Sequence, residues 1–328
     1  MKRVFMFGAL ALMSVFLIGC EEPEQEDNGK GANYDLTDGS HSYAMTIQGK
    51  RLTGIYDSDE ENPSSFEFGY GDKGELTEWR KYTGCDWEDY EITHNPLTLT
   101  LKRKYFEEKI ALTFNDDGYI SNCQYSRTYK VLKTDYVADI SYTYNKNNQV
   151  SKIVAKVKSV YGKSVTGDII LNLSYKGEVL LGAEGSETLT AFGETAMNYP
   201  LRIEYGYSEA VDNKLYQYSP DLAWLVTDNA IDEDSLFPLA VLGLFGKASA
   251  KFPTHIKVQE GDDVEEHNYS TDLNEDGTIN ESDSFSYTYS DDINTKAAEI
   301  RTMTATQNKK PCLNRKFKIA LQQYMTQE

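Results

Sequence analysis

The sequence predicts a mainly β protein, an antiparallel hairpin meander that forms a curved sheet or partial barrel with a short helical insertion. Three observations lead to this fold class. From about Tyr34 onward, apolar or aromatic residues alternate with polar ones, the period of two expected of strands with one buried face. The polar turns between these stretches repeat. The chain also contains 24 tyrosines, a residue that suits a half-buried pleated surface.

Residues 1–19 have the pattern of a lipoprotein signal peptide. Lys2 and Arg3 precede an apolar run at positions 4–18, which is shorter than a helix that spans a bilayer. The run leads into Leu17-Ile18-Gly19-Cys20, which resembles the lipobox where a diacylglycerol is attached to the cysteine before cleavage. We therefore expect lipidation of Cys20 and export to the cell envelope. An ordinary secretory peptide with an incidental cysteine is the alternative.

Residues 20–33 follow as an acidic tether. Positions 21–31 hold five carboxylates and no large apolar side chain, so the segment cannot bury enough surface to offset the entropy of ordering. An acidic stretch directly behind the lipidated cysteine also resembles the signal that sends Bacteroidetes lipoproteins to the outer face of the outer membrane. We therefore expect a lipid-anchored, surface-exposed outer-membrane protein. A solvated spacer without a sorting role is the alternative.

Residues 34–293 form the predicted β-rich domain. Its polar turns line up as a weak internal repeat, in which an aromatic residue or Leu ends one strand and an aliphatic residue begins the next. Gly, Asn and Asp supply the positive φ that tight turns require, so each unit predicts a β-hairpin. The units are Phe68–Leu76, Leu112–Ile120, Tyr142–Val150 and Leu173–Val179.

The period of two breaks at about 219–247, where we expect the helical insertion. Ser219 suits a helix N-cap, Pro220 suits the first helical position, and apolar residues follow at helical spacing. A second apolar run at 236–246 is too short to span lipid and is expected to cap the open edge or the hollow of the sheet.

The net charge of −19 limits the partners of the protein. The charge becomes −21 when Lys2 and Arg3 leave with the signal peptide, and so acidic a body disfavours nucleic acid and anionic membrane surfaces. We expect contact with the membrane through the lipid anchor only. The exception is the basic tail at 294–328, in which seven Lys or Arg and two Glu give a charge of +5, and whose apolar residues are compatible with a helix.

These features together resemble a family. The lipobox, the acidic tether, hairpins of the form Tyr-x-Tyr-Asn-x-x-Gly/Asn-x-Val and one helical insertion are similar to uncharacterised Bacteroidetes outer-membrane lipoproteins, whose domain of unknown function is described as a porin-like, curved antiparallel β fold. The resemblance covers roughly Tyr34 to Tyr289 and leaves out the basic tail. Because its motifs are turn chemistry, the resemblance implies a fold and no activity.

One segment near the end of the domain has the spacing of a calcium loop. Oxygen-bearing side chains stand at positions 1, 3, 5, 9 and 12 with Gly277 at position 6, as a hard cation requires of a single loop. Calcium is thus the one cofactor that the sequence suggests. The alternative is another hairpin turn of the repeat with its charges facing water. The candidate ligands are Asp272, Asn274, Asp276, Thr278, Asn280 and Asp283.

The remaining cysteines allow one disulfide. Cys85 and Cys123 each lie in a β-rich stretch and can pair in an oxidising compartment, although no spacing pattern demands it, and Cys312 is then left alone. Because no Cys-x-x-Cys or Cys/His cluster occurs, a structural zinc site is not expected.

The sequence contains no recognisable catalytic frame. It holds neither a Gly-x-Ser-x-Gly nor a His-Glu-x-x-His motif, and its four histidines stand in no known arrangement. We expect a non-catalytic cell-envelope lipoprotein that binds a small ligand, a glycan or a protein partner on the concave sheet face beneath the helical insertion. The alternatives are a surface glycan hydrolase, which needs two facing carboxylates, and a structural component of an envelope assembly, which needs large apolar or complementary surface patches.

Overall fold

The computed structural model describes the β-rich part of the chain, in the ranges 50–57, 65–71, 76–82, 87–93, 96–130, 134–161, 163–191, 194–227, 235–283 and 285–290. The signal peptide, Cys20, the tether and the basic tail lie outside the described residues, so the expectations for them stay predictions. In the described part of the chain, no helix is long and apolar enough to cross a membrane.

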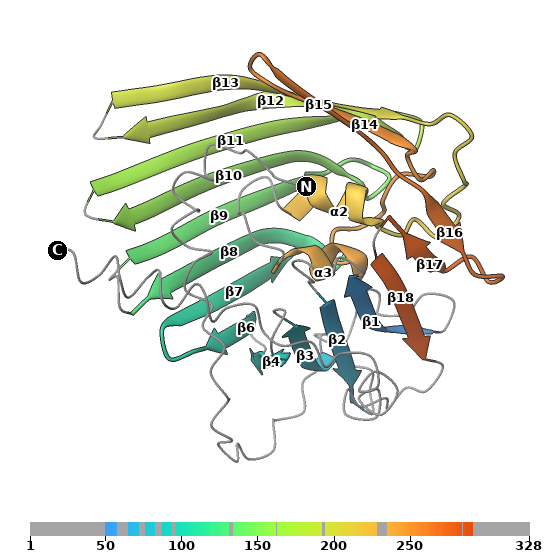
Figure 1. The fold of residues 1–328 in the computed structure, drawn as a ribbon, viewed down its shortest axis with the longest axis horizontal. Coiled ribbons are helices and arrows are strands. Elements are labelled where there is room, and N and C mark those ends of the chain that lie inside the picture. Colours follow the sequence, from blue (N-terminus) through green and yellow to red (C-terminus); the bar gives the residue numbers. More distant parts are fainter. Residues whose placement is uncertain are drawn as a thin grey trace, which may run out of the picture.

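Seven strands form the first sheet, in the order β16-β17-β18-β1-β2-β3-β4, and every paired neighbour is antiparallel (Figure 1). The turn between β2 and β3 belongs to the repeat, and the turn between β16 and β17 belongs to the candidate calcium loop. Its strands are β1 (Arg51–Asp57), β2 (Ser65–Tyr70), β3 (Leu76–Tyr82), β4 (Trp87–Asp89), β16 (Thr271–Leu273), β17 (Ile279–Ser282) and β18 (Phe285–Ser290).

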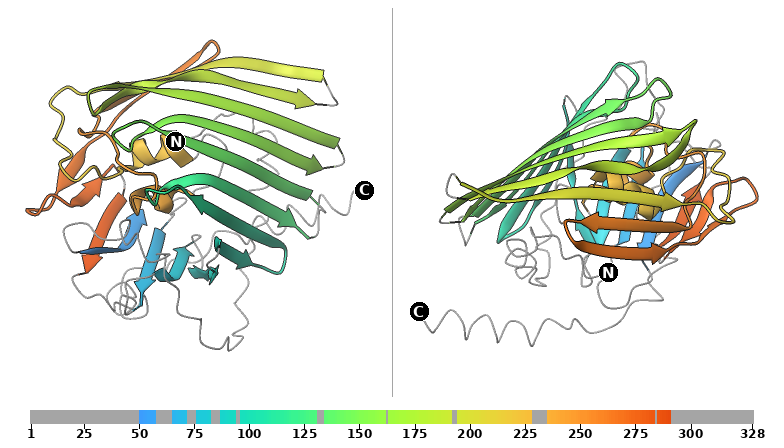
Figure 2. Two further views of the ribbon diagram at one scale, coloured as in Figure 1. Left: turned by 180° about the vertical axis from the view of Figure 1, so that it is seen from behind. Right: turned by 90° about the horizontal axis from the view of Figure 1, so that it is seen from above.

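Eleven strands form the second sheet, in chain order from β5 to β15. The views in Figure 2 show that this sheet is strongly curved. Its strands are β5 (Glu91–Thr93), β6 (Leu97–Lys102), β7 (Phe106–Phe114), β8 (Ile120–Tyr129), β9 (Thr134–Tyr144), β10 (Val150–Tyr161), β11 (Lys163–Lys176), β12 (Val179–Ala191), β13 (Glu194–Gly206), β14 (His255–Glu260) and β15 (Asp263–Asn268).

The strands follow one another in chain order around the molecule, and β18 returns to pair with β1 from Arg51 opposite Ser290 to Asp57 opposite Phe285. The two sheets meet at two seams. At the first seam, Tyr90 separates β4 from β5, and its N–H donates to the carbonyl of Trp79 at 2.9 Å. At the second seam, residues 269–270 separate β15 from β16. The predicted fold class, an antiparallel hairpin meander with curved sheets, is confirmed.

Two short helices, α2 (Pro220–Thr227) and α3 (Phe237–Val241), lie on the concave side of the sheets (Figures 1 and 2). Both belong to the interval 219–247, where the alternation breaks in the sequence. All of α3 and positions 221–227 of α2 are buried. Phe237 places its ring 6.4 Å from that of Phe66 and 5.1 Å from that of Phe285, centroid to centroid, so the insertion packs against the first sheet and shares the single core.

The chain after α3 closes one end of the curved second sheet. Residues 244–250 run along the hairpin turns and form backbone hydrogen bonds with them. The N–H of Lys247 donates to the carbonyl of Asn148 at 2.9 Å, and the N–H of Ala250 donates to that of Glu178 at 3.0 Å. The hairpin turns therefore hold the chain after α3 at this end of the second sheet. This contact gives the polar turns and the apolar run a common structural role.

The repeated tyrosines have a common structural role. In an antiparallel hairpin the end of one strand lies beside the start of the strand before it, and the tyrosine at or next to that end bonds across. Burial raises the pKa of these hydroxyls, to about 12 for Tyr207, so they remain protonated donors. Each bond runs from a tyrosine hydroxyl to a carbonyl at the start of the preceding strand: Tyr70 to Leu52 (2.6 Å), Tyr144 to Ile120 (2.6 Å), Tyr175 to Val150 (2.7 Å) and Tyr207 to Leu180 (2.5 Å).

Replacing Gly246 by alanine is expected to destabilise the fold more than the same change at Gly177. Both glycines have positive φ, at 76° and 64°, which costs an L-residue about 1–2 kcal/mol. A Cβ on Gly246 would also lie 2.3 Å from the carbonyl oxygen of Asn148, whereas one on Gly177 meets nothing within 4 Å. We expect a further loss of about 1–3 kcal/mol in Gly246→Ala only. Urea unfolding measures both variants, and equal losses would show that the closing segment yields freely.

Candidate functional site

Charged side chains line the inner faces of the strands at the first seam. On β7 the inward positions are Phe106, Glu108, Ile110 and Leu112, so a carboxylate stands in an otherwise apolar row. The register places Arg127 of β8 directly opposite Glu108. We call the charged and tyrosine side chains at this seam the seam cluster. Its members are Lys81, Glu88, Tyr90, Arg103, Glu108, Tyr125 and Arg127.

Glu108 is the centre of the seam cluster, with none of its surface exposed. The hydroxyl of Tyr90 donates to Oε1 at 2.7 Å. The hydroxyl of Tyr125 and Nε of Arg127 donate to Oε2 at 3.1 and 3.0 Å, and Nη2 of Arg127 also contacts Oε2. The guanidinium carbon of Arg127 lies 5.1 Å from the ring centroid of Phe106. Both oxygens of this carboxylate therefore accept hydrogen bonds, as a buried charge requires.

The charges around Glu108 decide its ionisation. Burial raises its pKa, but the charges of Arg127 and Lys81 and the hydrogen bonds from Tyr90 and Arg127 outweigh burial and lower the pKa to about 2. The same carboxylate acts in the opposite sense on Tyr90, whose pKa is raised well above its usual value by burial and then by the charge of Glu108. The pair is thus an ionised carboxylate and a neutral phenol at neutral pH.

Lys81 joins this cluster from β3. The register places it opposite Phe66 of β2 and Glu88 of β4, and its Nζ lies 5.8 Å from the ring centroid of Phe66. Glu88 is already paired with Arg103. Burial raises the pKa of Glu88, against the lowering effect of Arg103 and Lys81. The described members of the cluster therefore include three cations and two carboxylates.

No motif in the sequence marks the seam cluster as a site. The period of two in Phe106-x-Glu108-x-Ile110-x-Leu112 would have placed Glu108 on the buried face, which is a usable signal. Its partners come from β3, from the seam residue Tyr90 and from β8, and no local pattern links those segments.

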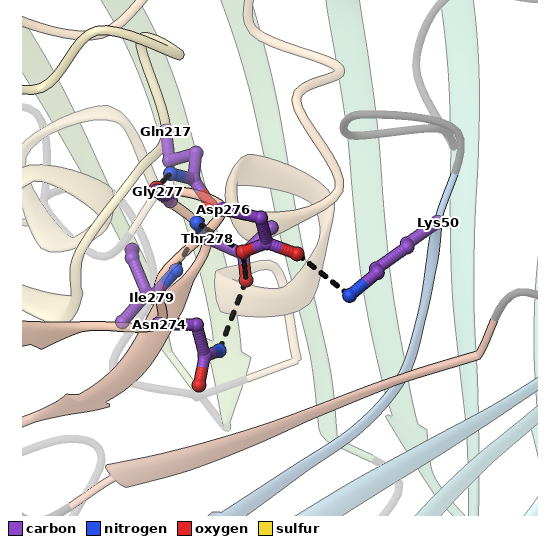
Figure 3. A network of polar contacts seen from close by, with 7 residues as sticks. All are labelled: Lys50, Gln217, Asn274, Asp276, Gly277, Thr278 and Ile279. Atoms are coloured by element: carbon purple, nitrogen blue, oxygen red, sulfur yellow. Dashed lines mark hydrogen bonds and ion pairs between the residues drawn. The ribbon is translucent and has the colours of Figure 1, made fainter.

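The segment proposed as a calcium loop folds as a β-hairpin between β16 and β17 (Figure 3). The N–H of Gly277 donates to the carbonyl of Asn274 at 2.9 Å, and Gly277 has a φ of 84°. Gln217, just before α2, forms two hydrogen bonds with the backbone of the turn. Its Nε2 donates to the carbonyl of Gly277 at 2.8 Å, and its Oε1 accepts from the N–H of Ile279 at 3.2 Å. The backbone of this segment therefore has the conformation of the alternative, a hairpin turn between two paired strands.

Side-chain oxygens of Asp272 and Asp276 in this hairpin are bonded within the molecule. Oδ1 of Asp276 accepts from the hydroxyl of Thr278 at 2.7 Å, and Oδ2 of Asp276 pairs with Nζ of Lys50 at 2.6 Å (Figure 3). These two partners lower the pKa of Asp276. Oδ2 of Asp272 accepts from Nδ2 of Asn280 at 3.1 Å, while Asp283 is exposed with a φ of 53°. Calcium binding by the six residues stays a prediction.

The other candidate residues give a mixed result. Cys123 is buried on β8 and has a free thiol, whose pKa is raised by burial. Cys85 lies outside the described residues, so its pairing with Cys123 stays a prediction. Among the described residues, no group of three or more His, Cys, Asp or Glu side chains is arranged to hold a metal ion.

No protein-family model and no curated protein sequence matches the chain. The fold is similar to two solved porin-like proteins. One, from Bacteroides vulgatus, has 11% sequence identity and a TM-score of 0.47, with 73% of this chain and 98% of that chain covered. The other, from Bacteroides uniformis, has 11% identity and a TM-score of 0.42, with 74% and 97% covered. The similarity to these Bacteroides proteins concerns the general β-rich fold alone.

Replacing Arg127 by methionine is expected to lower the free energy of unfolding by about 3–5 kcal/mol, because it leaves the buried carboxylate of Glu108 without its cation. Arg202→Met on β13 is the matched control, since Arg202 is 56% exposed and its ion pairs are on the surface, where the loss is at most about 1 kcal/mol. Urea unfolding at neutral pH gives both values, and similar losses would contradict a buried-charge role.

A pH profile separates charge from packing in this experiment. The folded pKa of Glu108, about 2, lies below that of an unfolded glutamate, about 4.3, so the stability it supplies is complete above the unfolded value and is lost as the pH falls through the folded one. Between about pH 4.5 and 2, wild type should lose more stability than Glu108→Gln. Parallel profiles would show that the carboxylate is not held ionised.

Proposed function

We propose that the protein is a lipid-anchored, non-catalytic protein of the cell envelope that is held at the outer membrane through Cys20, faces the cell surface and binds a ligand inside its curved sheets. The lipobox before Cys20 and the acidic residues behind it support the location. The tether at 20–33 gives the β-rich domain the reach to work at a distance from the lipid.

The observation that carries the binding proposal is the surplus cation of the seam cluster. Arg127 and Arg103 each contact a carboxylate, whereas Lys81 has no hydrogen bond or ion pair within the described residues. Its side chain keeps 9% of its surface exposed. A buried charge is stable only when it is paired, and the aromatic ring of Phe66 beside it is an apolar surface. A ligand with an anionic head and an apolar body fits both neighbours.

The two alternatives have less support among the described residues. A glycan hydrolase needs two carboxyl groups about 5–9.5 Å apart across a cleft. Glu187 is buried and Glu260 is half-buried, and their carboxyl groups act on each other at short range, closer than either hydrolytic geometry requires. An assembly component needs a continuous apolar patch. The large apolar side chains with high exposure belong to five separate segments: Val137, Ile170, Leu181, Val211 and Val264.

Replacing Cys20 by alanine tests the anchor. We expect wild type to incorporate labelled palmitate in a diderm bacterial host and to sediment with the outer membrane. Cys20→Ala should lose the label and the membrane association, since no other membrane contact is proposed. Cys312→Ala is the control and should behave as wild type. Unlabelled wild type, or label retained by Cys20→Ala, would refute the lipobox assignment. Protease digestion of intact cells then reports surface exposure.

Replacing Lys81 by methionine tests the binding site. The probes are laurate and dodecyl phosphate, which join an anionic head to an apolar chain, with the neutral dodecyl maltoside for comparison. Each anionic probe should raise the melting temperature of the mature chain by about 3 °C, because binding to the folded state stabilises it. Lys81→Met should lose this rise and Lys109→Met, an exposed change on β7, should keep it. Absence of a rise in wild type, or its survival in Lys81→Met, would reject the site.

A further inference from the structure

Two aromatic side chains are partly exposed on the outer face of the first sheet, where β4 is the edge strand. Tyr82 of β3 stands directly opposite Trp87 of β4, and their ring centroids are 5.4 Å apart. Their neighbours Lys81 and Glu88 are buried on the inner face in the seam cluster, so the alternation of the strands directs both rings outward. We call Tyr82 and Trp87 the aromatic platform.

Two ion pairs hold a guanidinium group beside the platform. Arg80 of β3 lies opposite Asp89 of β4 and opposite Glu67 of β2. Its Nε donates to Oδ1 of Asp89 at 2.6 Å, and its Nη1 donates to Oε2 of Glu67 at 3.0 Å. Its guanidinium carbon lies 5.2 Å from the ring centroid of Trp87. Two carboxylates therefore fix the guanidinium next to the indole before any ligand arrives.

The burial of Glu67 shows that this face is more than a solvated surface. Glu67 alternates with the core residues Phe66 and Phe68 and so points away from the core, yet none of its surface is exposed. The ring of Tyr56 lies across Gly54, where a Cβ would come within 2.6 Å of it, and the hydroxyl of Tyr56 lies 3.5 Å from Oε1 of Glu67. A sheet face that meets only water keeps its charges in solvent, so this arrangement indicates a preorganised surface.

The platform carries polar groups that the protein itself does not use. Among the described residues, the hydroxyl of Tyr82, Nε1 of Trp87 and Nη2 of Arg80 have no hydrogen-bond partner. The side chain of Asp89 is 71% exposed. Two partly exposed rings are therefore bordered by open donors and by an open acceptor, held in place by the ion pairs.

We propose that the aromatic platform, together with Arg80 and Asp89, binds the sugar rings of a glycan. A pyranose ring has an apolar face of C–H groups and a rim of hydroxyls that donate and accept, so it requires an aromatic surface beside fixed polar groups of both kinds. The platform is bordered by one cation and one exposed carboxylate, which suits a neutral ligand rich in hydroxyls. This site lies on the outer face and does not depend on ligand binding at Lys81.

A protein partner fits this face less well than a glycan. A stable protein interface buries about 800 Å² on each side and has an apolar centre. On this face two partly exposed rings stand among charged groups, and none of the described large apolar side chains with high exposure belongs to the first sheet. The apolar area therefore matches a short stretch of sugar rings and not the centre of a protein interface.

The first test is tryptophan fluorescence of the mature lipidated chain in a detergent without a sugar head group. The probes are cellohexaose, maltohexaose and mannohexaose, with sorbitol as a control that has hydroxyls but no ring. Trp79 and Trp224 are buried, so a sugar on the platform changes the signal of Trp87, the third tryptophan. At least one hexasaccharide should protect Trp87 from quenching by acrylamide, and sorbitol should not.

Variants then assign the binding, measured by isothermal titration calorimetry. Trp87→Ala should weaken binding at least about tenfold, because it removes a stacking surface, and Trp87→Phe should keep most of it. Asp89→Ala, an exposed change, should also weaken binding. The matched control is Tyr105→Ala, since the partly exposed ring of Tyr105 lies 5.2 Å from Nζ of Lys104. Tyr105→Ala and Lys81→Met should bind the sugar as wild type does.

Three outcomes would overturn the proposal. The first is wild type that shows neither protection nor heat of binding with any of the hexasaccharides at millimolar concentration. The second is binding that survives unchanged in Trp87→Ala and in Asp89→Ala, which would place the sugar elsewhere. The third is a dimer of wild type, seen by sedimentation velocity, that Trp87→Ala abolishes, which would assign this face to contact between copies of the chain.

Discussion

The pairing of β1 with β18 is the constraint on which the rest of the structure depends. It joins segments about as far apart as the described chain allows, and the hydroxyls of Thr53 and Thr288, 235 positions apart, lie 3.2 Å from each other across it. Because β18 returns to β1, the inner faces of both sheets surround one space. That space must be filled, and the insertion that carries α2 and α3 supplies much of the filling. A meander without this return would leave both the core and the helices open to water.

Two buried carboxyl groups in this enclosure have pKa values that are shifted in opposite directions. Glu108 faces Arg127 and Lys81, which lower its pKa, so it stays ionised. Glu187 has comparable burial but faces Glu260, which raises its pKa, so it tends to keep a proton. Burial alone acts in the same direction on both groups, and the sign of the nearest charge decides the outcome. The first arrangement joins the two sheets, while the second leaves a local excess of negative charge.

The sequence allowed the local part of this fold to be predicted and not the closure. Turn residues such as Asn145 and Gly177, and the alternation around them, are short-range signals, and the hairpins they predict are present. Pro220 and the break in alternation located the helical insertion. The pairing of β1 with β18 has no such signal, because its residues are far apart in the chain. The seam cluster depends on the same closure, and with 52 acidic residues in the chain no single carboxylate stands out until the register is known.

The hairpin at 272–283 shows why a motif can indicate two structures. Asn, Asp and Gly are common in calcium loops because they supply oxygens and positive φ, and they are common in tight turns because they bond their own backbone and tolerate positive φ. The difference lies in where the lone pairs go. One oxygen of Asp276 accepts a hydrogen bond from Thr278 and the other pairs with Lys50, while Asp272 accepts a hydrogen bond from Asn280. A cation that binds there has to displace these partners.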